Sequence, residues 1–148
     1  MAFGYGDVFD AVAEAVKPGD PAIHCDGDTM TWGEFSSRSN ALARALIAAG
    51  LEPDAKVGQY MRNSPEYAVV FVAAFKARLA PVNVNYRYGP DELLYLFDNS
   101  DSEAVFFDAA FAENARQLRP RLPRVKLWAS VGGRVDGFAC LDDLVRGD

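Results

Sequence analysis

The sequence predicts a layered α/β fold in which helices flank a partly parallel sheet and a β-hairpin precedes it. Three observations lead to this prediction. Segments with helical and strand periodicity alternate along the chain. Residues 104–107 form a compact, wholly apolar run, which is typical of a strand covered on both faces. Asp26-Gly27-Asp28 separates two short strand-like segments, 22–25 and 29–32, as a hairpin turn does.

Start and stop signals support the helices. Thr31 and Glu34 have capping-box spacing, and Gly50 follows the helix that they open. Ser64 and Pro65 suit the cap and the first position of the next helix. In chain order, the predicted helices are Asp7–Val16 (with Val8, Phe9, Val12 and Val16 on one side), Phe35–Ala49, Glu66–Ala77, one opened by Pro90, Ala109–Leu118, and one or two turns in Leu141–Asp148. After the hairpin, the predicted strands are Lys56–Met61, Leu79–Val84, Ala104–Phe107 and Pro123–Val131.

Composition excludes several classes of protein. The 148 residues are 50% hydrophobic and 24% charged, which suits one domain, and the net charge of −6 argues against a nucleic-acid-binding face. Cys25 and Cys140 are expected to be free thiols in a reducing compartment, and a single histidine, His24, argues against a zinc site. The most apolar run, Tyr67–Phe75, is too short to cross a membrane. A soluble, cytoplasmic protein is expected, and peripheral contact with a membrane surface stays open.

Most potential catalytic patterns have ordinary explanations. Gly132-Gly133 lacks the neighbours of a phosphate-binding loop, so a plain turn is expected, and no dinucleotide fingerprint follows a strand. No Ser/His/Asp set can be assembled around His24. The acidic pairs are expected to be solvated surface groups; these are Asp26, Asp28, Asp142 and Asp143.

The segment Asn83–Tyr88 is the most distinctive. It places amide, aromatic and cationic side chains after a predicted buried strand, where ligands of open α/β sheets bind. A ligand contact there is one interpretation. The other is that Arg87 pairs with Asp91 or Glu92 while the tyrosines cover the core, and composition alone favours this second interpretation.

Several short motifs stand in a fixed order. They are Thr31-Trp32-Gly33-Glu34-Phe35, Asn40–Leu46, Gly50-Leu51-Glu52-Pro53, Lys56-Val57, Asn63-Ser64-Pro65-Glu66-Tyr67, Ala77–Tyr88, Asp91-Glu92-Leu93 and Tyr95-Leu96. Their order and spacing resemble the opening of the adenylate-forming (AMP-binding) superfamily, and cover the chain from about Asp7 to its end. The run Asn83–Tyr88 resembles the acyl-CoA synthetase branch, in particular actinobacterial fatty-acid and steroid-side-chain CoA ligases. Arg78 stands where the wider superfamily commonly has glycine.

The resemblance implies a function. Enzymes of this family join a carboxylic acid to CoA in two steps, using ATP and Mg²⁺ and forming an acyl-adenylate and then acyl-CoA, AMP and pyrophosphate. It also implies that Arg87 lies near the CoA nucleotide phosphate, with Tyr86 or Tyr88 flanking the nucleotide. No catalytic residue and no metal ligand is expected within these residues.

The family's ATP phosphate-binding loop, ribose-binding Asp, hinge and catalytic Lys are absent from residues 1–148. These residues are therefore expected to be a single incomplete domain, the N-terminal portion of the AMP-binding large domain, and to be inactive alone. The rest of the large domain would be missing because of a truncated gene, a cloned fragment or an incomplete sequence. Two alternatives remain: a stand-alone, non-catalytic α/β module that binds a nucleotide, a CoA-like ligand or a protein partner, and a second chain that supplies the missing parts. The residues that shape the family's acyl pocket lie largely downstream, so the acyl group stays open.

Overall fold

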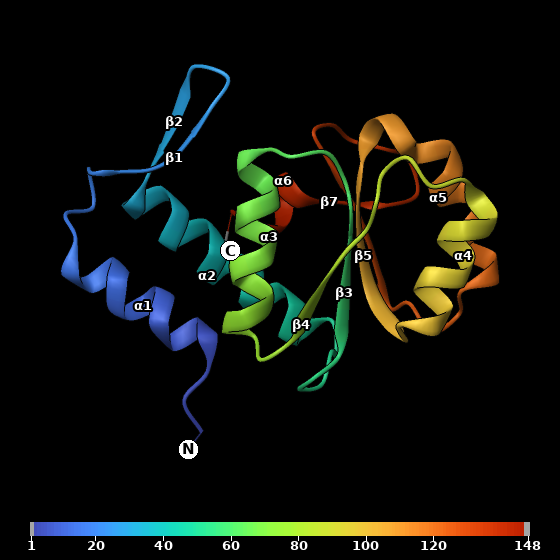
Figure 1. The fold of residues 1–148 in the computed structure, drawn as a ribbon, viewed down its shortest axis with the longest axis horizontal. Helices are drawn as coiled ribbons and strands as arrows, with labels where there is room; N and C mark the ends of the chain where they lie inside the picture. The colour runs from blue at the N-terminus through green and yellow to red at the C-terminus, as the bar shows by residue number, and fades with distance from the viewer. Residues whose placement is uncertain (1, 147–148) are drawn as a thin grey trace.

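The fold is a three-layered α/β arrangement with a hairpin at one side (Figure 1). A computed structural model describes residues 2–146. The helices are α1 (Tyr5–Ala15), α2 (Trp32–Ala48), α3 (Pro65–Lys76), α4 (Pro90–Asn99), α5 (Ala112–Leu118) and α6 (Leu141–Leu144), with 3-10 turns η1 (Ala109–Phe111) and η2 (Arg119–Arg121). The strands are β1 (Pro21–Cys25), β2 (Asp28–Thr31), β3 (Lys56–Tyr60), β4 (Ala80–Asn83), β5 (Ser102–Asp108), β6 (Leu127–Val131) and β7 (Ala139–Cys140).

The main sheet has the order β4-β3-β5-β6-β7, and its neighbouring strands are all parallel. The strands β1 and β2 form the separate antiparallel hairpin. The predicted fold class is therefore confirmed. Parallel strands need crossover connections, and helices α3, α4 and α5 supply them.

Side chains of β5 point alternately into two cores. Ala104 and Phe106 join the core beneath α2 and α3, whereas Val105 and Phe107 join the core beneath α4 and α5. All four are fully buried. The apolar run is thus buried on both faces of the sheet, which explains why polar and apolar residues do not alternate in it.

Local signals fixed the helix starts. The Thr31 hydroxyl accepts from the Glu34 backbone N–H at 3.2 Å, and the Glu34 carboxylate accepts from the Thr31 N–H at 3.0 Å. Ser64 caps α3 by accepting from the Tyr67 N–H at 3.3 Å. Gly50 has a φ of 87°, the left-handed conformation expected after a helix.

Helix α1 packs against α3 through a face that differs from the one predicted from its apolar residues. Phe9 packs against the core, but Val8 and Val12 are exposed. The contact is made at Gly6, where a Cβ atom would lie 2.7 Å from the Lys76 Cα atom. Because Gly6 lets the backbones of α1 and α3 approach closely, its face, and not the valine face, turns inward.

Two segments near the C-terminus differ from their predictions. Strand β6 begins at Leu127 and not at Pro123, because the Val125 N–H donates to the Leu122 carbonyl and closes a turn first. The two-residue strand β7 was not predicted, and α6 is one short turn of helix. Residues 147–148 of the predicted terminal helix lie outside the described residues.

None of the helices in residues 2–146 combines the length and the apolar content that a membrane crossing requires. Both cysteines are free thiols, as predicted.

Candidate functional site

The strand order places a switch in chain direction at β3. The connection through α3 leads from β3 to β4 on one side, and the connection through α4 then leads back across to β5 on the other side. Ligands of open α/β sheets bind at such a switch, beyond the carboxyl ends of the strands. The edge where β3 and β5 end is therefore the candidate site.

A small cavity of about 280 Å³ lies at this edge. It is lined by Met61, Arg62, Asn63, Ser64, Glu66, Asp108, Val131 and Gly132. Pockets for drug-sized ligands usually measure about 300–1,000 Å³. The cavity is slightly smaller than such pockets.

Arg62 and Asp108 form an ion pair across the switch, with Nε 2.9 Å from Oδ2. Burial raises the pKa of Asp108, but hydrogen bonds from the Arg62 guanidinium and the Ala110 N–H outweigh it, so the pKa lies below its ordinary value. The same hydrogen bond raises the pKa of Arg62. Both groups stay charged at neutral pH. Because Asp108 neutralises the positive charge of Arg62, Arg62 is a poor ligand for phosphate.

We expect Asp108→Asn to lower the free energy of unfolding by about 0.2–1 kcal/mol at about pH 7, because the exposed side of the pair is screened by water. The amide oxygen can still accept from the Ala110 N–H, so the turn keeps its cap, while the charge and the hydrogen bond from Arg62 are lost. The folded pKa is depressed, hence the stabilisation is complete above the unfolded pKa of about 3.9 and disappears as the pH falls through the folded value. Urea titrations at several pH values should therefore converge for the two proteins in acid. A constant difference at every pH would contradict this origin.

Three aromatic rings stack beside the ion pair. Tyr60, at the end of β3, lies 4.8 Å from Phe111 of η1, with 20° between the ring planes. Tyr86, in the loop after β4, lies 6.2 Å from the same Phe111 ring, with 9° between the ring planes. We call Tyr60, Phe111 and Tyr86 the aromatic column.

The predicted ligand segment meets this column at the surface. The Arg87 guanidinium carbon lies 5.9 Å from the centre of the Tyr86 ring. The predicted alternative, a pair with Asp91 or Glu92, does not form: among the described residues, no carboxylate is in ion-pair contact with Arg87. Tyr88 instead lines a separate hollow of about 500 Å³ on α4. The structure thus groups Tyr86 with Arg87 and places Tyr88 at a different hollow.

Sequence reasoning missed Arg62, Asp108 and Phe111. Their neighbours in space are distant in sequence, 46 residues apart for the ion pair. One signal was available, since Arg62 and Asp108 stand at or just beyond the ends of two predicted strands. Parallel strands end at one edge of the sheet, so such residues are brought together.

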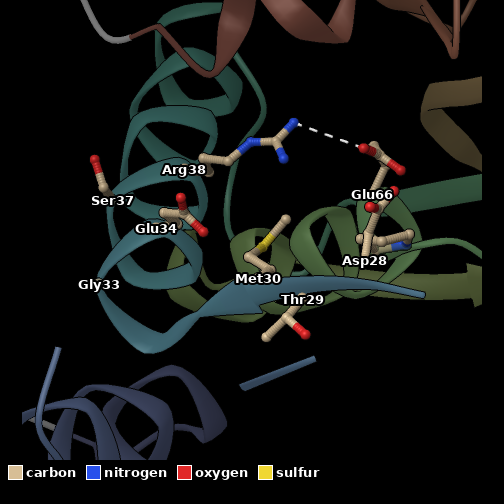
Figure 2. Close-up of a pocket in the computed structure, with 9 residues that line it drawn as sticks. Asp28, Thr29, Met30, Gly33, Glu34, Ser37, Arg38 and Glu66 are labelled. Carbon is tan, nitrogen blue, oxygen red and sulfur yellow. Dashed lines mark ion pairs between the residues drawn. The ribbon is translucent and has the colours of Figure 1, made fainter. Parts of the chain in front are cut away.

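A larger hollow of about 690 Å³ lies between the hairpin and the N-terminal ends of α2 and α3. Figure 2 shows Arg38 and Glu66 pointing toward each other across it, with their charged atoms 3.9 Å apart. Asp28 and Glu34 add two further carboxylates to the lining. This surplus of negative charge disfavours phosphate, and no ligand is assigned to the hollow.

Within residues 2–146, no three His, Cys, Asp or Glu side chains come together as a metal site would require. Mg²⁺ in nucleotide-dependent enzymes is held by one or two carboxylates together with substrate phosphates.

Comparison with known proteins shows the family. The model of the AMP-binding enzyme family matches residues 9–138. A 3-oxocholest-4-en-26-oate–CoA ligase of Rhodococcus rhodochrous is 37% identical over 126 residues, covering 85% of this chain and 22% of that protein. Medium-chain acyl-CoA ligase Mig of Mycobacterium avium is 37% identical, covering 97% of this chain and 28% of that protein.

Solved structures show the same fold. The anthranilate CoA ligase AuaEII superposes with a TM-score of 0.89 at 20% identity, covering 97% of this chain and 28% of that one. A benzoate CoA ligase from Burkholderia xenovorans gives 0.84 at 22% identity, covering 98% and 28%. The chain spans about a quarter of the length of these proteins. Since the family model accounts for nearly all of its residues, this chain is a member of the AMP-binding enzyme family.

Proposed function

We propose that residues 1–148 are the N-terminal portion of the large domain of an ATP-dependent acyl-CoA ligase. The observation that carries the proposal is the 37% identity, over 85% of this chain, with a protein named as a CoA ligase. The parent enzyme would convert a carboxylic acid, ATP and CoA into acyl-CoA, AMP and pyrophosphate through an acyl-adenylate. ATP, Mg²⁺ and CoA are its proposed cofactors and substrates.

The proposed acid is a medium- or long-chain fatty acid or a steroid with a carboxylated side chain. Relatives from Rhodococcus and Mycobacterium are named for these acids. A competition assay in the parent enzyme between a long-chain fatty acid and a steroid-side-chain acid would separate the two. The fatty acid is ruled out as the main substrate if the steroid acid has the higher kcat/KM.

The 148 residues alone are expected to form no acyl-adenylate. Transition-state stabilisation in phosphoryl chemistry comes from preorganised cations and backbone donors around the phosphates, and the family's phosphate-binding loop is not among residues 1–148. The measurement is pyrophosphate release from ATP by the purified chain, with and without each acid. Release that depends on the added acid would refute the expectation.

We also propose that Arg87 binds a phosphate of CoA in the parent enzyme. The guanidinium is exposed, is not in ion-pair contact with any described carboxylate, and lies on a loop beyond the end of β4. A guanidinium presents a fixed fork of donors that suits phosphate and stays charged at any working pH. Tyr86 beside it is the better placed of the two tyrosines to flank the nucleotide, because Tyr88 lines the hollow on α4.

In the parent enzyme, Arg87→Ala is expected to raise the KM for CoA by about tenfold, the size of one lost charged hydrogen bond. Formation of the acyl-adenylate should not change, because CoA enters only afterwards. Arg44→Ala is the matched control, since Arg44 is also exposed but lies on α2, away from the carboxyl edge of the sheet. Equal losses in both half-reactions, or an unchanged KM, would return Arg87 to a purely structural role.

A further inference from the structure

The aromatic column runs from the core to the surface. Tyr60 is 1% exposed, whereas Tyr86 is 40% exposed. Phe111 stacks with each of these rings, its plane tilted by 20° from Tyr60 and by 9° from Tyr86. The three rings come from three separate segments: the end of β3, the turn η1 and the loop after β4. The column therefore ties a surface loop to the buried part of the sheet.

The inner end of the column is fixed. The Tyr60 hydroxyl accepts a hydrogen bond from the Asn114 amide of α5 at 2.9 Å. Tyr60 also belongs to the core beneath α4 and α5. A ring held by burial and by its hydroxyl offers its neighbour a stationary surface.

Phe111 is fixed by the turn that carries it. The Asp108 carboxylate accepts from the Ala110 N–H at 3.0 Å, which caps η1, and is held in place by Arg62 at 2.9 Å. The Arg62 guanidinium also lies 5.5 Å from the centre of the Phe111 ring. The ion pair at the switch point thus sets both the turn and the ring.

The outer end of the column is next to the proposed phosphate ligand. The Arg87 N–H donates to the Asn85 side-chain oxygen at 3.0 Å, and the Tyr88 N–H donates to the Asn85 carbonyl at 3.0 Å. These bonds shape the loop but do not tie it to the sheet. Val84 anchors the start of the loop in the core beneath α4 and α5, and Tyr86, one residue before Arg87, adds a second connection by stacking on Phe111.

We propose that Phe111 is a positioning residue for CoA binding: by stacking on Tyr86 it holds the loop that presents Arg87 to a CoA phosphate. The proposal rests on the proposed function of Arg87. Binding groups need supporting residues that fix their geometry, and Phe111 supplies this support from the core side. The positioning role requires no contact between Phe111 and CoA.

The first test measures loop order in the 148-residue chain without any ligand. Phe111→Leu keeps the apolar volume but removes the flat ring, whereas Phe111→Tyr keeps the ring. Amide hydrogen exchange at Arg87 and Tyr88 should become about threefold to tenfold faster in the leucine variant, and stay near the parent rate in the tyrosine variant. Amides of α2 serve as the control and should not change. Unchanged exchange at Arg87 and Tyr88 in the leucine variant would overturn the proposal.

The second test uses the parent enzyme and CoA. Phe111→Leu should raise the KM for CoA about threefold to tenfold while adenylate formation is spared. Phe111→Tyr, which keeps the ring, should leave the KM for CoA near the parent value. Added to Arg87→Ala, Phe111→Leu should cause no further loss, because both act through one contact. An effect of Arg87→Ala without one of Phe111→Leu refutes the positioning role alone. If Arg87→Ala has no effect, the CoA contact itself is refuted, and the positioning role falls with it.

Discussion

Replacing Phe107 with alanine is expected to lower the free energy of unfolding by about 3–5 kcal/mol. Phe107 is 0% exposed on the central strand β5 and meets the Phe138 ring edge-on at a centroid distance of 4.9 Å. The Trp128 ring lies 6.4 Å from both of these rings, so the three aromatics form one cluster. Truncation removes the buried area of the ring and leaves a cavity between two layers that cannot close without moving β5. For a domain whose total stability is about 5–15 kcal/mol, this loss is a large fraction.

The measurement is urea unfolding followed by circular dichroism. Tyr95→Ala is the matched control, since it removes an aromatic ring that is 71% exposed on α4, and it should change stability by less than about 0.5 kcal/mol. If the two variants were equally stable, Phe107 would not lie in the core.

Gly58→Ala is expected to cost about 1–3 kcal/mol, although it adds a single methyl group. Gly58 lies in the middle of β3, and a Cβ atom there would stand 2.7 Å from Cε1 of the Phe97 ring. That ring projects from α4 into the core between the helix and the sheet and is 1% exposed, so it has little room to move. The strain arises from overpacking and is specific to one neighbour.

A double-mutant cycle with Phe97→Leu checks this cause. The smaller side chain should accommodate the methyl group, so the double variant should be more stable than the two single changes predict by addition. Gly19→Ala is the control, because no atom lies within 4 Å of its added Cβ and its loss should be negligible. Strict additivity would show that the cost at Gly58 has another origin.

Local signals in the sequence predicted most of the elements. Thr31, Ser64 and Gly50 set helix ends through hydrogen bonds and backbone conformations that involve residues only a few positions away. The boundaries failed where a turn competes with a strand, as before Leu127, and where a strand is as short as β7.

Long-range contacts could not be predicted in the same way. Whether Gly6 or Val8 faces α3 depends on how closely two backbones approach, which periodicity does not describe. The contacts of Phe111 depend on the meeting of three chain segments. The site prediction named Tyr86 and Arg87, whose part in binding stays a prediction, but not the residues that contact them.

Arg78 shows how one departure from a family pattern is accommodated. Its φ of 63° is left-handed, which explains why glycine is common at this position. The arginine side chain also contacts Asp7 at 3.1 Å, and Asp7 in turn accepts from the Gly4 N–H at 2.7 Å. The strained residue thus connects the start of α1 to the end of α3, a contact that glycine could not make.

The position of β3 matters while the chain is being synthesised. β3 is the first strand of the sheet to be made, yet it lies inside the sheet, between β4 and β5. Because synthesis proceeds from the N-terminus, both edges of β3 are unpaired when it is made. The second edge can pair only after β5, Ser102–Asp108, has left the ribosome. Unpaired strand edges are templates for association between chains. Nascent chains paused between Tyr60 and Asp108 are therefore the ones most exposed to aggregation, and this interval is where a chaperone would be most useful.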